Sequence, residues 1–273
     1  MRGILDAVSP AATLLEALQP IRSNPRDAAV LLDIDGTLAP IVRHSADAQV
    51  PEATRTLLIE IARRYRIVAC VSGRRAVTAR QIVAIGTIAY VGNHGGELLR
   101  PGSTSVEVDP QLADWTERVR RFATTAATAE VQRARVRSED KGAVAAFHWR
   151  GAPDEQSAAA LVEQIALSAQ QQGFVVHWGR KVLEVRPPVA LHKGLGVATL
   201  LGESVVAGAL YVGDDTTDLD AFRGLRELVD AGTLARAICV AVDSEEAPAE
   251  LSREADLTVA GTDGVRELLG ALL

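Results

Sequence analysis

Two aspartates stand two residues apart at the end of an apolar run. Asp33 and Asp35 belong to the segment DIDGT, which follows the apolar residues 29–32. Two carboxylates that lie close together repel each other and lose solvation unless a cation lies between them. The spacing therefore indicates a bound cation at the end of a strand. An ordinary Asp-Gly turn after a strand is the alternative interpretation.

A second acidic segment, GDDTTD at 213–218, also ends an apolar run and opens a helical pattern. Its aspartates, Asp214, Asp215 and Asp218, offer the oxygen ligands that hard divalent cations prefer. Capping of a helix N-terminus by Asp215 or Thr216 would explain one of these acids. It does not explain all of them, so this segment predicts a cation site.

Two further segments could hold an anion. The residues Ser72, Gly73 and Arg74 open a helix after an apolar run, where a hydroxyl and backbone N–H groups can bind negative charge. Lys193 stands at another helix start, where a cation is unfavourable for the helix dipole. Neutralising a phosphate and the crowded carboxylates would explain that lysine. A serine N-cap and a solvated surface lysine are the alternatives.

The apolar runs that lead to these residues alternate with helical patterns. Strands are expected at 29–32, 67–71, 88–91, 209–212, 237–242 and 257–260. Helices are expected near the N-terminus within 1–26, from 51 onward, and at 75–84, 194–201, 217–229 and 265–272. Such alternation predicts a parallel sheet with right-handed crossovers. Ligands bind beyond the carboxyl ends of such strands, where the polar segments would meet.

The pattern changes between residues 108 and 186. Helices and hairpins are expected there in alternation, at 110–130, 133–149, 154–171 and 174–185. This order suits an antiparallel sheet with helices on one face. We therefore expect an α/β protein with a Rossmann-like parallel-sheet core, formed by 1–107 and 187–273, and an inserted α+β cap domain.

Composition limits the function further. The chain of 273 residues is 48% hydrophobic but 4% aromatic, which suits a core of small aliphatic side chains between sheet and helices. The net charge of −6, without a long basic run, argues against nucleic acid as a partner. No apolar run reaches the roughly 20 residues that span a membrane. Because Asp6, Pro10 and Glu16 interrupt the N-terminal segment, we expect a cytoplasmic protein without a secretory signal.

The polar segments resemble the motifs of the haloacid dehalogenase-like phosphatase superfamily, namely DIDGT at 33–37, Ser72 in VSGR, Lys193, and GDDTTD at 213–218. The resemblance implies that Asp33 is a nucleophile that forms an aspartyl-phosphate. It implies that Asp35 is the general acid/base. Ser72 and Lys193 would bind the phosphate.

The same resemblance implies magnesium as the cofactor. Its ligands would be Asp33, Asp214 and the backbone carbonyl of Asp35. Asp215 and Asp218 would lie beside these ligands and support them. A carboxylate nucleophile needs such help, because a cation offsets its repulsion from an anionic substrate.

A finer resemblance is to the trehalose-6-phosphate phosphatases. It rests on GNHG at 92–95 with Glu97, EDK at 139–141, HWR at 148–150, GRKVLEVRP at 179–187, HKG at 192–194 and GDDTTDLDAF at 213–222. It implies a cap that closes over a disaccharide, and functional coupling to a trehalose-6-phosphate synthase. We expect the hinges near 101–102 and 187–188, where the chain crosses between the domains. The implied substrate-binding residues are Gly73, Arg74, Asn93, His94, Lys141, Arg150, Lys181 and Glu184.

Three positions depart from the pattern of that family. Arg180, Trp149 and Leu219 stand where lysine, tyrosine and glutamate are common. None belongs to the catalytic set, so the departures concern the sugar. Phosphatases of sucrose-, glucosylglycerol- or mannosylglycerate-type phosphates, a phosphomutase, and a non-catalytic regulatory subunit are the alternatives. An ordinary polar turn at 139–141 and a surface salt bridge of Arg150 are alternatives for the cap residues.

Overall fold

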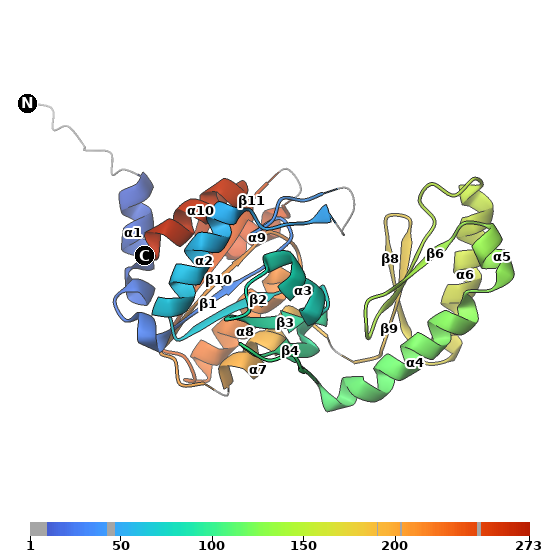
Figure 1. Cartoon of the computed structure of the whole chain (residues 1–273), viewed down its shortest axis with the longest axis horizontal. Helices are drawn as coiled ribbons and strands as arrows, with labels where there is room; N and C mark the ends of the chain where they lie inside the picture. The colour runs from blue at the N-terminus through green and yellow to red at the C-terminus, as the bar shows by residue number, and fades with distance from the viewer. Residues whose placement is uncertain (1–9, 43–46, 190, 203, 245–246) are drawn as a thin grey trace, which may run out of the picture. The chain divides into compact units, whose positions relative to one another are not determined.

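The structure is a computed structural model that describes residues 10–42, 47–189, 191–202, 204–244 and 247–273. The chain divides into two compact units (Figure 1). We call Met1–Val106 with His192–Leu273 the core unit, and Glu107–Leu191 the cap unit. The predicted cap segment, 108–186, falls within the second of these units.

The core unit contains an eight-stranded sheet with the order β12-β11-β10-β1-β2-β3-β4-β5. Its parallel strands are β1 (Ala28–Leu32), β2 (Ile67–Val71), β3 (Ala89–Gly92), β10 (Gly208–Gly213), β11 (Arg236–Asp243) and β12 (Leu257–Ala260). These are the six expected strands, so the predicted parallel sheet is confirmed. The sheet also has β4 (Glu97–Leu99), antiparallel to β3, and β5 (Val106–Val108), which were not predicted.

Alternate residues of β1 face opposite layers of helices, as strand geometry requires. Val30 and Leu32 pack into one buried cluster, while Ala29 and Leu31 pack into another. The first cluster includes residues of α1 (Pro10–Arg22), α2 (Glu52–Arg64), α3 (Ala76–Val83) and α10 (Gly261–Ala271). The second includes residues of α7 (Lys193–Gly202), α8 (Asp218–Asp230) and α9 (Ala249–Glu254). Because helices cover both of its faces, all residues of β1 are apolar.

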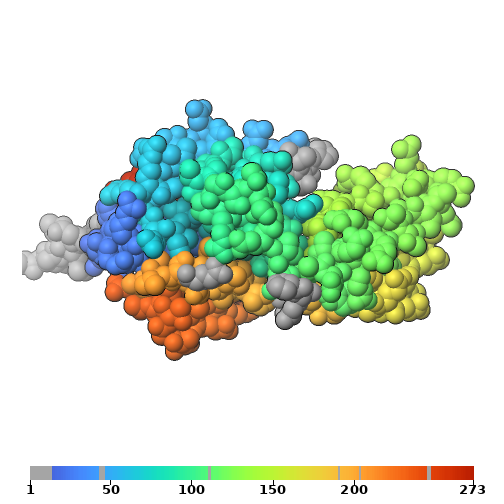
Figure 2. All heavy atoms as spheres, turned by 60° about the horizontal axis from the view of Figure 1, so that its bottom comes forward, coloured from blue at the N-terminus to red at the C-terminus, as the bar shows by residue number. Residues whose placement is uncertain are grey.

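The two stretches of chain that form the core unit are far apart in sequence. In the space-filling view, N-terminal residues in blue and C-terminal residues in orange share one continuous surface (Figure 2). The expected N-terminal helix is α1, and the preceding residues 1–9 lie outside the described residues. Among the helices that the structure describes, none is long and apolar enough to cross a membrane.

The cap unit is a four-stranded antiparallel sheet with its own buried core. The sheet order is β6-β7-β9-β8, with β6 (Arg137–Asp140), β7 (Ala145–His148), β8 (Val175–Gly179) and β9 (Val182–Arg186). The helices are α4 (Pro110–Ala126), α5 (Ala129–Arg133) and α6 (Glu155–Gln171). Phe147 and Leu183 pack against Val162 of α6 in this core. The expected helix and hairpin order is therefore confirmed.

Two details of the cap differ from expectation. The single helix expected at 110–130 is two helices, because the Thr128 side chain accepts a hydrogen bond from the Val131 N–H and starts α5 anew. The first hairpin strand begins at Arg137 and not at Arg133, which is the last residue of α5.

Candidate active site

Three polar residues follow three neighbouring parallel strands. Asp33 follows β1, Ser72 follows β2, and Asp214 follows β10. Strand β1 pairs with both β2 and β10, and the Asp33 N–H continues this pairing with a hydrogen bond of 2.9 Å to the Val212 carbonyl. The chain leaves β1 toward β2 on one side and returns to it through β10 on the other. Ligands bind at such a switch point in open α/β sheets.

Lys193 lies at the centre of this site. Its Nζ is 2.7 Å from Oδ1 of Asp33 and 2.7 Å from Oδ1 of Asp218. The lysine is 2% exposed, so the alternative of a solvated surface lysine is wrong. Burial alone would lower the pKa of Lys193, but the surrounding carboxylates raise it, and the ammonium stays charged.

Close backbone contacts fix the start of α7, and with it Lys193. A Cβ on Gly194 would lie 2.3 Å from a backbone oxygen of α8, and a Cβ on Gly224 of α8 would lie 2.8 Å from Cα of Gly194. On the other side, a Cβ on Gly196 would lie 2.7 Å from Cα of Gly95. The helix start is therefore held between α8 and the turn Asn93–Gly95, at distances that only glycine permits.

Asp218 holds its neighbours and has no lone pair left for a cation. Its Oδ1 accepts hydrogen bonds from Lys193 Nζ at 2.7 Å and from Tyr211 OH at 2.6 Å. Its Oδ2 accepts from the backbone N–H groups of Asp214 and Asp215 at 2.9 and 3.0 Å. A carboxylate offers about four lone-pair sites, and all are used here. Asp218 is thus a support for Lys193 and for the segment that carries Asp214.

Asp33 and Asp214 have the oxygens that a metal could use. Carboxylate oxygens of Asp33, Asp214 and Asp218 all lie within 4.8 Å of one another, and all three residues are buried. The second oxygen of Asp33 and of Asp214 accepts no hydrogen bond within the described ranges. Burial raises the pKa of Asp33 well above its usual range, and Lys193 offsets this only in part. Crowded, buried carboxylates with open oxygens fit a divalent cation.

The DIDGT segment turns sharply after Asp33 and does form an Asp-Gly turn. The N–H groups of Leu38 and Ala39 both donate to the Ile34 carbonyl, at 2.9 and 2.8 Å. Gly36 has φ +84°, and a Cβ on it would lie 2.0 Å from Oδ2 of Asp214. The turn therefore needs glycine for both its conformation and its space. The turn and the carboxylate site are parts of one arrangement and not competing interpretations.

The phosphate-binding segment expected after β2 lies beside this turn. Ser72 is 2% exposed, and its Oγ accepts a hydrogen bond of 3.2 Å from the Arg74 N–H. No acceptor in the described part of the chain takes the Ser72 hydroxyl hydrogen, so it can be donated to a ligand. The Arg74 side chain lies on Asp35, with Nε 2.6 Å from Oδ2 and Nη2 2.7 Å from Oδ1. Above Gly73, a Cβ would lie 2.7 Å from the His94 ring.

Asn93 and His94 form a strained turn against that segment. Their φ angles are 51° and 54°, and Gly95 follows with φ 101°. The Asn93 and His94 N–H groups donate to the carbonyls of Arg74 and Ser72, at 2.7 and 3.2 Å. Asn93 is 1% exposed, and neither polar atom of its side-chain amide has a hydrogen-bond partner among the residues that the structure describes. Left-handed residues cost about 1–3 kcal/mol each and cluster at functional sites.

In the cap unit, Lys141 and Glu184 contact each other. Lys141 Nζ lies 2.9 Å from Oε1 of Glu184, and Arg186 Nε donates to Oε2 at 3.0 Å. Burial alone would raise the pKa of Glu184, but Lys141 and Arg186 lower it to about 2. The carboxylate in this apolar strand thus has the partners that its burial requires.

The other two cap candidates lie at the β8–β9 turn. Lys181 Nζ is 2.5 Å from Oε2 of Glu155, at the start of α6. Arg150 Nη2 donates to the Arg180 carbonyl at 3.1 Å. Arg150 therefore supports the turn through a backbone carbonyl. The predicted cap residues form two groups, one around Glu184 and one at this turn.

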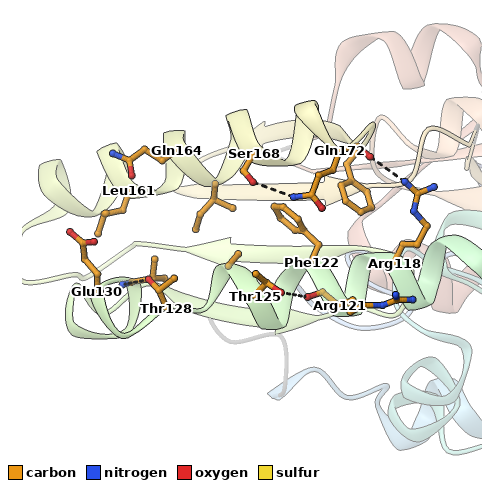
Figure 3. Close-up of a pocket in the computed structure, with 14 residues that line it drawn as sticks. Arg118, Arg121, Phe122, Thr125, Thr128, Glu130, Leu161, Gln164, Ser168 and Gln172 are labelled. Carbon is orange, nitrogen blue, oxygen red and sulfur yellow. Dashed lines mark hydrogen bonds between the residues drawn. The ribbon is translucent and has the colours of Figure 1, made fainter.

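One hollow of the cap unit holds none of the predicted residues. It is a groove of about 480 Å³ between α4 and α6 (Figure 3). Phe122, Ile165 and Phe174 line it and belong to the cap core. At one end, the guanidinium carbon of Arg118 lies 3.6 Å from the centroid of the Trp115 ring. The predicted catalytic and substrate-binding residues all lie outside this groove.

Sequence reasoning missed the roles of Thr37 and Tyr211. Thr37 is fully buried, and its Oγ1 donates to Oδ1 of Asp214 at 3.1 Å. Tyr211 is also fully buried and donates to Asp218. A phenol in the middle of an otherwise aliphatic strand was the available signal, because a buried hydroxyl needs a partner.

The fold and this site define a class of protein. Acidic residues and a serine follow the carboxyl ends of adjacent parallel strands, and a buried lysine contacts the first of these acids, as the superfamily resemblance implies. The chain therefore has the fold of the haloacid dehalogenase-like phosphatases. The structure of the C-terminal domain of the Candida albicans trehalose-6-phosphate phosphatase shares this fold, with a TM-score of 0.69 and 22% identity, over 97% of this chain and 96% of that one.

Sequence comparison identifies the family. The model of a family described as trehalose-phosphatase matches residues 31–256, and the chain belongs to that family. A probable trehalose-phosphate phosphatase of Sinorhizobium fredii is 33% identical over 225 residues, which are 81% of this chain and 83% of that protein. A probable trehalose-phosphate phosphatase 4 of rice is 30% identical over 213 residues, 76% of this chain and 58% of the rice protein.

Proposed function

We propose that this chain hydrolyses trehalose 6-phosphate to trehalose and inorganic phosphate, with Asp33 as the nucleophile. The observation that carries the proposal is the buried contact of Asp33 with Lys193 beside Asp214, in a chain of the trehalose-phosphatase family. A non-catalytic subunit would have no physical reason to keep several carboxylates buried together at a cost in free energy.

The reaction proceeds in two transfers. An oxygen of Asp33 attacks the phosphorus, the bond between phosphorus and the sugar oxygen breaks, and Asp35 gives that oxygen a proton. Asp35 then takes a proton from water as the water attacks the phosphorus of the aspartyl-phosphate. This releases inorganic phosphate and restores Asp33. The Lys193 ammonium and the Ser72 hydroxyl hold phosphoryl oxygens during both transfers.

Mg²⁺ is the proposed cofactor. Asp33 and Asp214 would hold it through their open oxygens, together with the backbone carbonyl of Asp35, and Asp215 and Asp218 would support these ligands. When bound, such an ion offsets the repulsion between carboxylates and phosphate and stabilises charge on the transferred group.

The cap unit is proposed to recognise the sugar. Lys141 and Glu184 present charged hydrogen-bonding groups that suit a polyhydroxyl ligand, and Arg150 and Lys181 are further candidates at the second group. In the core unit, Gly73, Asn93 and His94 are proposed to contact the substrate beside the phosphate-binding segment. We take 108–186 as the inserted cap domain and expect it to close over the disaccharide, turning near 101–102 and 187–188. Small-angle scattering that shows no compaction with phosphate and Mg²⁺ would contradict closure.

The central experiment is phosphate release from trehalose 6-phosphate with Mg²⁺ and with a chelator. We expect release by the wild type with Mg²⁺ alone, and a loss of about a thousandfold or more for Asp33→Asn. The matched control is Asp230→Asn, which removes an exposed carboxylate at the end of α8 and should leave the rate unchanged. Phosphate release by Asp33→Asn at the wild-type rate would refute the assignment of the nucleophile.

A substrate panel separates the neighbouring possibilities. Trehalose 6-phosphate should be turned over faster than sucrose-, glucosylglycerol- and mannosylglycerate-type phosphates and faster than a generic monoester. Equal rates across the panel would contradict the proposed substrate. Release of free phosphate without a bisphosphate activator excludes a phosphomutase. We infer that a trehalose-6-phosphate synthase supplies the substrate.

A further inference from the structure

Arg74 binds the Asp35 carboxylate through two parallel hydrogen bonds. Nε donates to Oδ2 at 2.6 Å, and Nη2 donates to Oδ1 at 2.7 Å. Paired charge-assisted bonds of this kind fix the orientation of a carboxylate as well as its distance. The two side chains are 18% and 38% exposed, so the pair is better shielded than an ordinary surface ion pair.

The backbone of Arg74 is anchored on both sides. Its N–H donates to Ser72 Oγ at 3.2 Å. Its carbonyl accepts a hydrogen bond of 2.7 Å from the N–H of Asn93, the first residue of the strained turn after β3. A side chain that leaves so constrained a backbone can define the position of the group that it contacts.

Asp35, by contrast, depends on Arg74. It lies beyond the end of β1, next to the turn at Gly36. Within the described part of the chain, no other side chain or backbone group forms a hydrogen bond or ion pair with the Asp35 carboxylate. Asp33 differs in this respect, because Lys193 holds it. Without Arg74, none of the described residues would fix the orientation of the Asp35 carboxylate through a hydrogen bond or ion pair.

We propose that Arg74 is a positioning residue, which orients Asp35 for proton transfer and does not itself hold the phosphoryl group. The inference rests on the proposed function, since it takes Asp35 as the general acid/base. Each Asp35 oxygen keeps a second lone pair outside the two bonds to Arg74. A proton can leave for the sugar oxygen from such a lone pair, and a proton from water can return to it.

A double-mutant cycle on trehalose 6-phosphate turnover tests this inference. Proton transfer by a positioned side chain contributes about 10²–10⁴-fold, so Asp35→Asn should lower kcat by at least about a hundredfold. Arg74→Ala should lower kcat by about tenfold or more. The variant with both changes should be no slower than Asp35→Asn, because Arg74 acts through Asp35. Losses that multiply would overturn the inference.

Binding of inorganic phosphate gives a second readout that does not require turnover. With Mg²⁺ present, the Kd of inorganic phosphate should change by less than about twofold in Arg74→Ala. If Arg74 held the phosphate through charge-assisted hydrogen bonds, its removal would raise that Kd by about tenfold or more. Such a rise would overturn the inference. Arg74→Lys keeps the charge but loses the planar fork, so it should recover little of kcat.

The matched control is Arg75→Ala. It removes the same charge at the adjacent position, where the side chain is 44% exposed and lies 3.7 Å from Glu97. It should keep wild-type kcat and phosphate affinity. Failure of the proposed function appears in the wild type, as absent phosphate release. Failure of the inference appears in the Arg74 variants, as multiplying losses or weakened phosphate binding.

Discussion

A methyl group added at Gly194 should displace Lys193 without touching any reacting atom. Its Cβ would lie 2.3 Å from the backbone oxygen of Asp220, and real contacts of this kind are not shorter than 3.0 Å. The start of α7 must therefore move from α8 by about 0.7 Å, the difference between those two distances. Overpacking of this size lowers the free energy of unfolding by about 1–3 kcal/mol. The higher helix propensity of alanine offsets up to about 1 kcal/mol of that loss.

Activity should fall more than stability. A displacement of about 1 Å at a catalytic group can cost about a hundredfold in rate, so Gly194→Ala should lose about tenfold or more in kcat. Urea denaturation measures the free energy of unfolding, and phosphate release measures kcat. The control is Gly202→Ala at the other end of α7, where a Cβ would meet no atom of the described, non-adjacent residues within 4 Å. The reasoning is refuted if both variants are as active and as stable as the wild type.

Three further changes follow from the site. Tyr211→Phe removes one of the hydrogen bonds to buried Asp218 and should lower the free energy of unfolding by about 1.5–3 kcal/mol in urea denaturation; no change would mean that the phenol contributes nothing. Gly36→Ala, whose Cβ would lie 2.0 Å from Asp214, should lose most Mg²⁺ affinity by calorimetry, and unchanged affinity would contradict the proposed ligands. Because the pKa of Glu184 is lowered in the folded state, from 4.5 to about 2, its contribution to stability is present above about pH 4.5 and is lost toward pH 2. Between these pH values, urea denaturation should therefore show that the free energy of unfolding falls more steeply with decreasing pH for the wild type than for Glu184→Gln.

The sheet and the residues at its edge could be predicted because each follows from local sequence. An apolar run of four to six residues before an acid marks a buried strand and its end, and Asp33 and Asp214 were found in this way. Strands β4 and β5 have three residues each, which is too short for a pattern to be visible. Strand β4 lies between β3 and the edge strand β5, and both pair because of their neighbours in the sheet and not because of their own composition.

Contacts between side chains that are distant in sequence could not be predicted. Arg74 and Asp35 are 39 residues apart, and nothing in either segment indicates that the arginine turns toward the aspartate. The sequence assigned three acids of GDDTTD to one cation site, but four hydrogen bonds occupy Asp218. Composition identifies which groups are available, while the packing decides which of their lone pairs remain open.

The position of the cap unit within the chain has a consequence during synthesis. The lysine that holds Asp33 is made 160 residues after that aspartate, and β10 pairs with residues of β1 that precede it by 180 residues, as in the pair Ala28 and Gly208. At a synthesis rate of about 5–20 residues per second, the edge of β1 that pairs with β10 stays unpaired for on the order of 10–30 s. An unpaired apolar edge is open to aggregation in that interval. The cap unit has a core of its own and can fold meanwhile, so the nascent chain is most vulnerable at β1 until β10 leaves the ribosome.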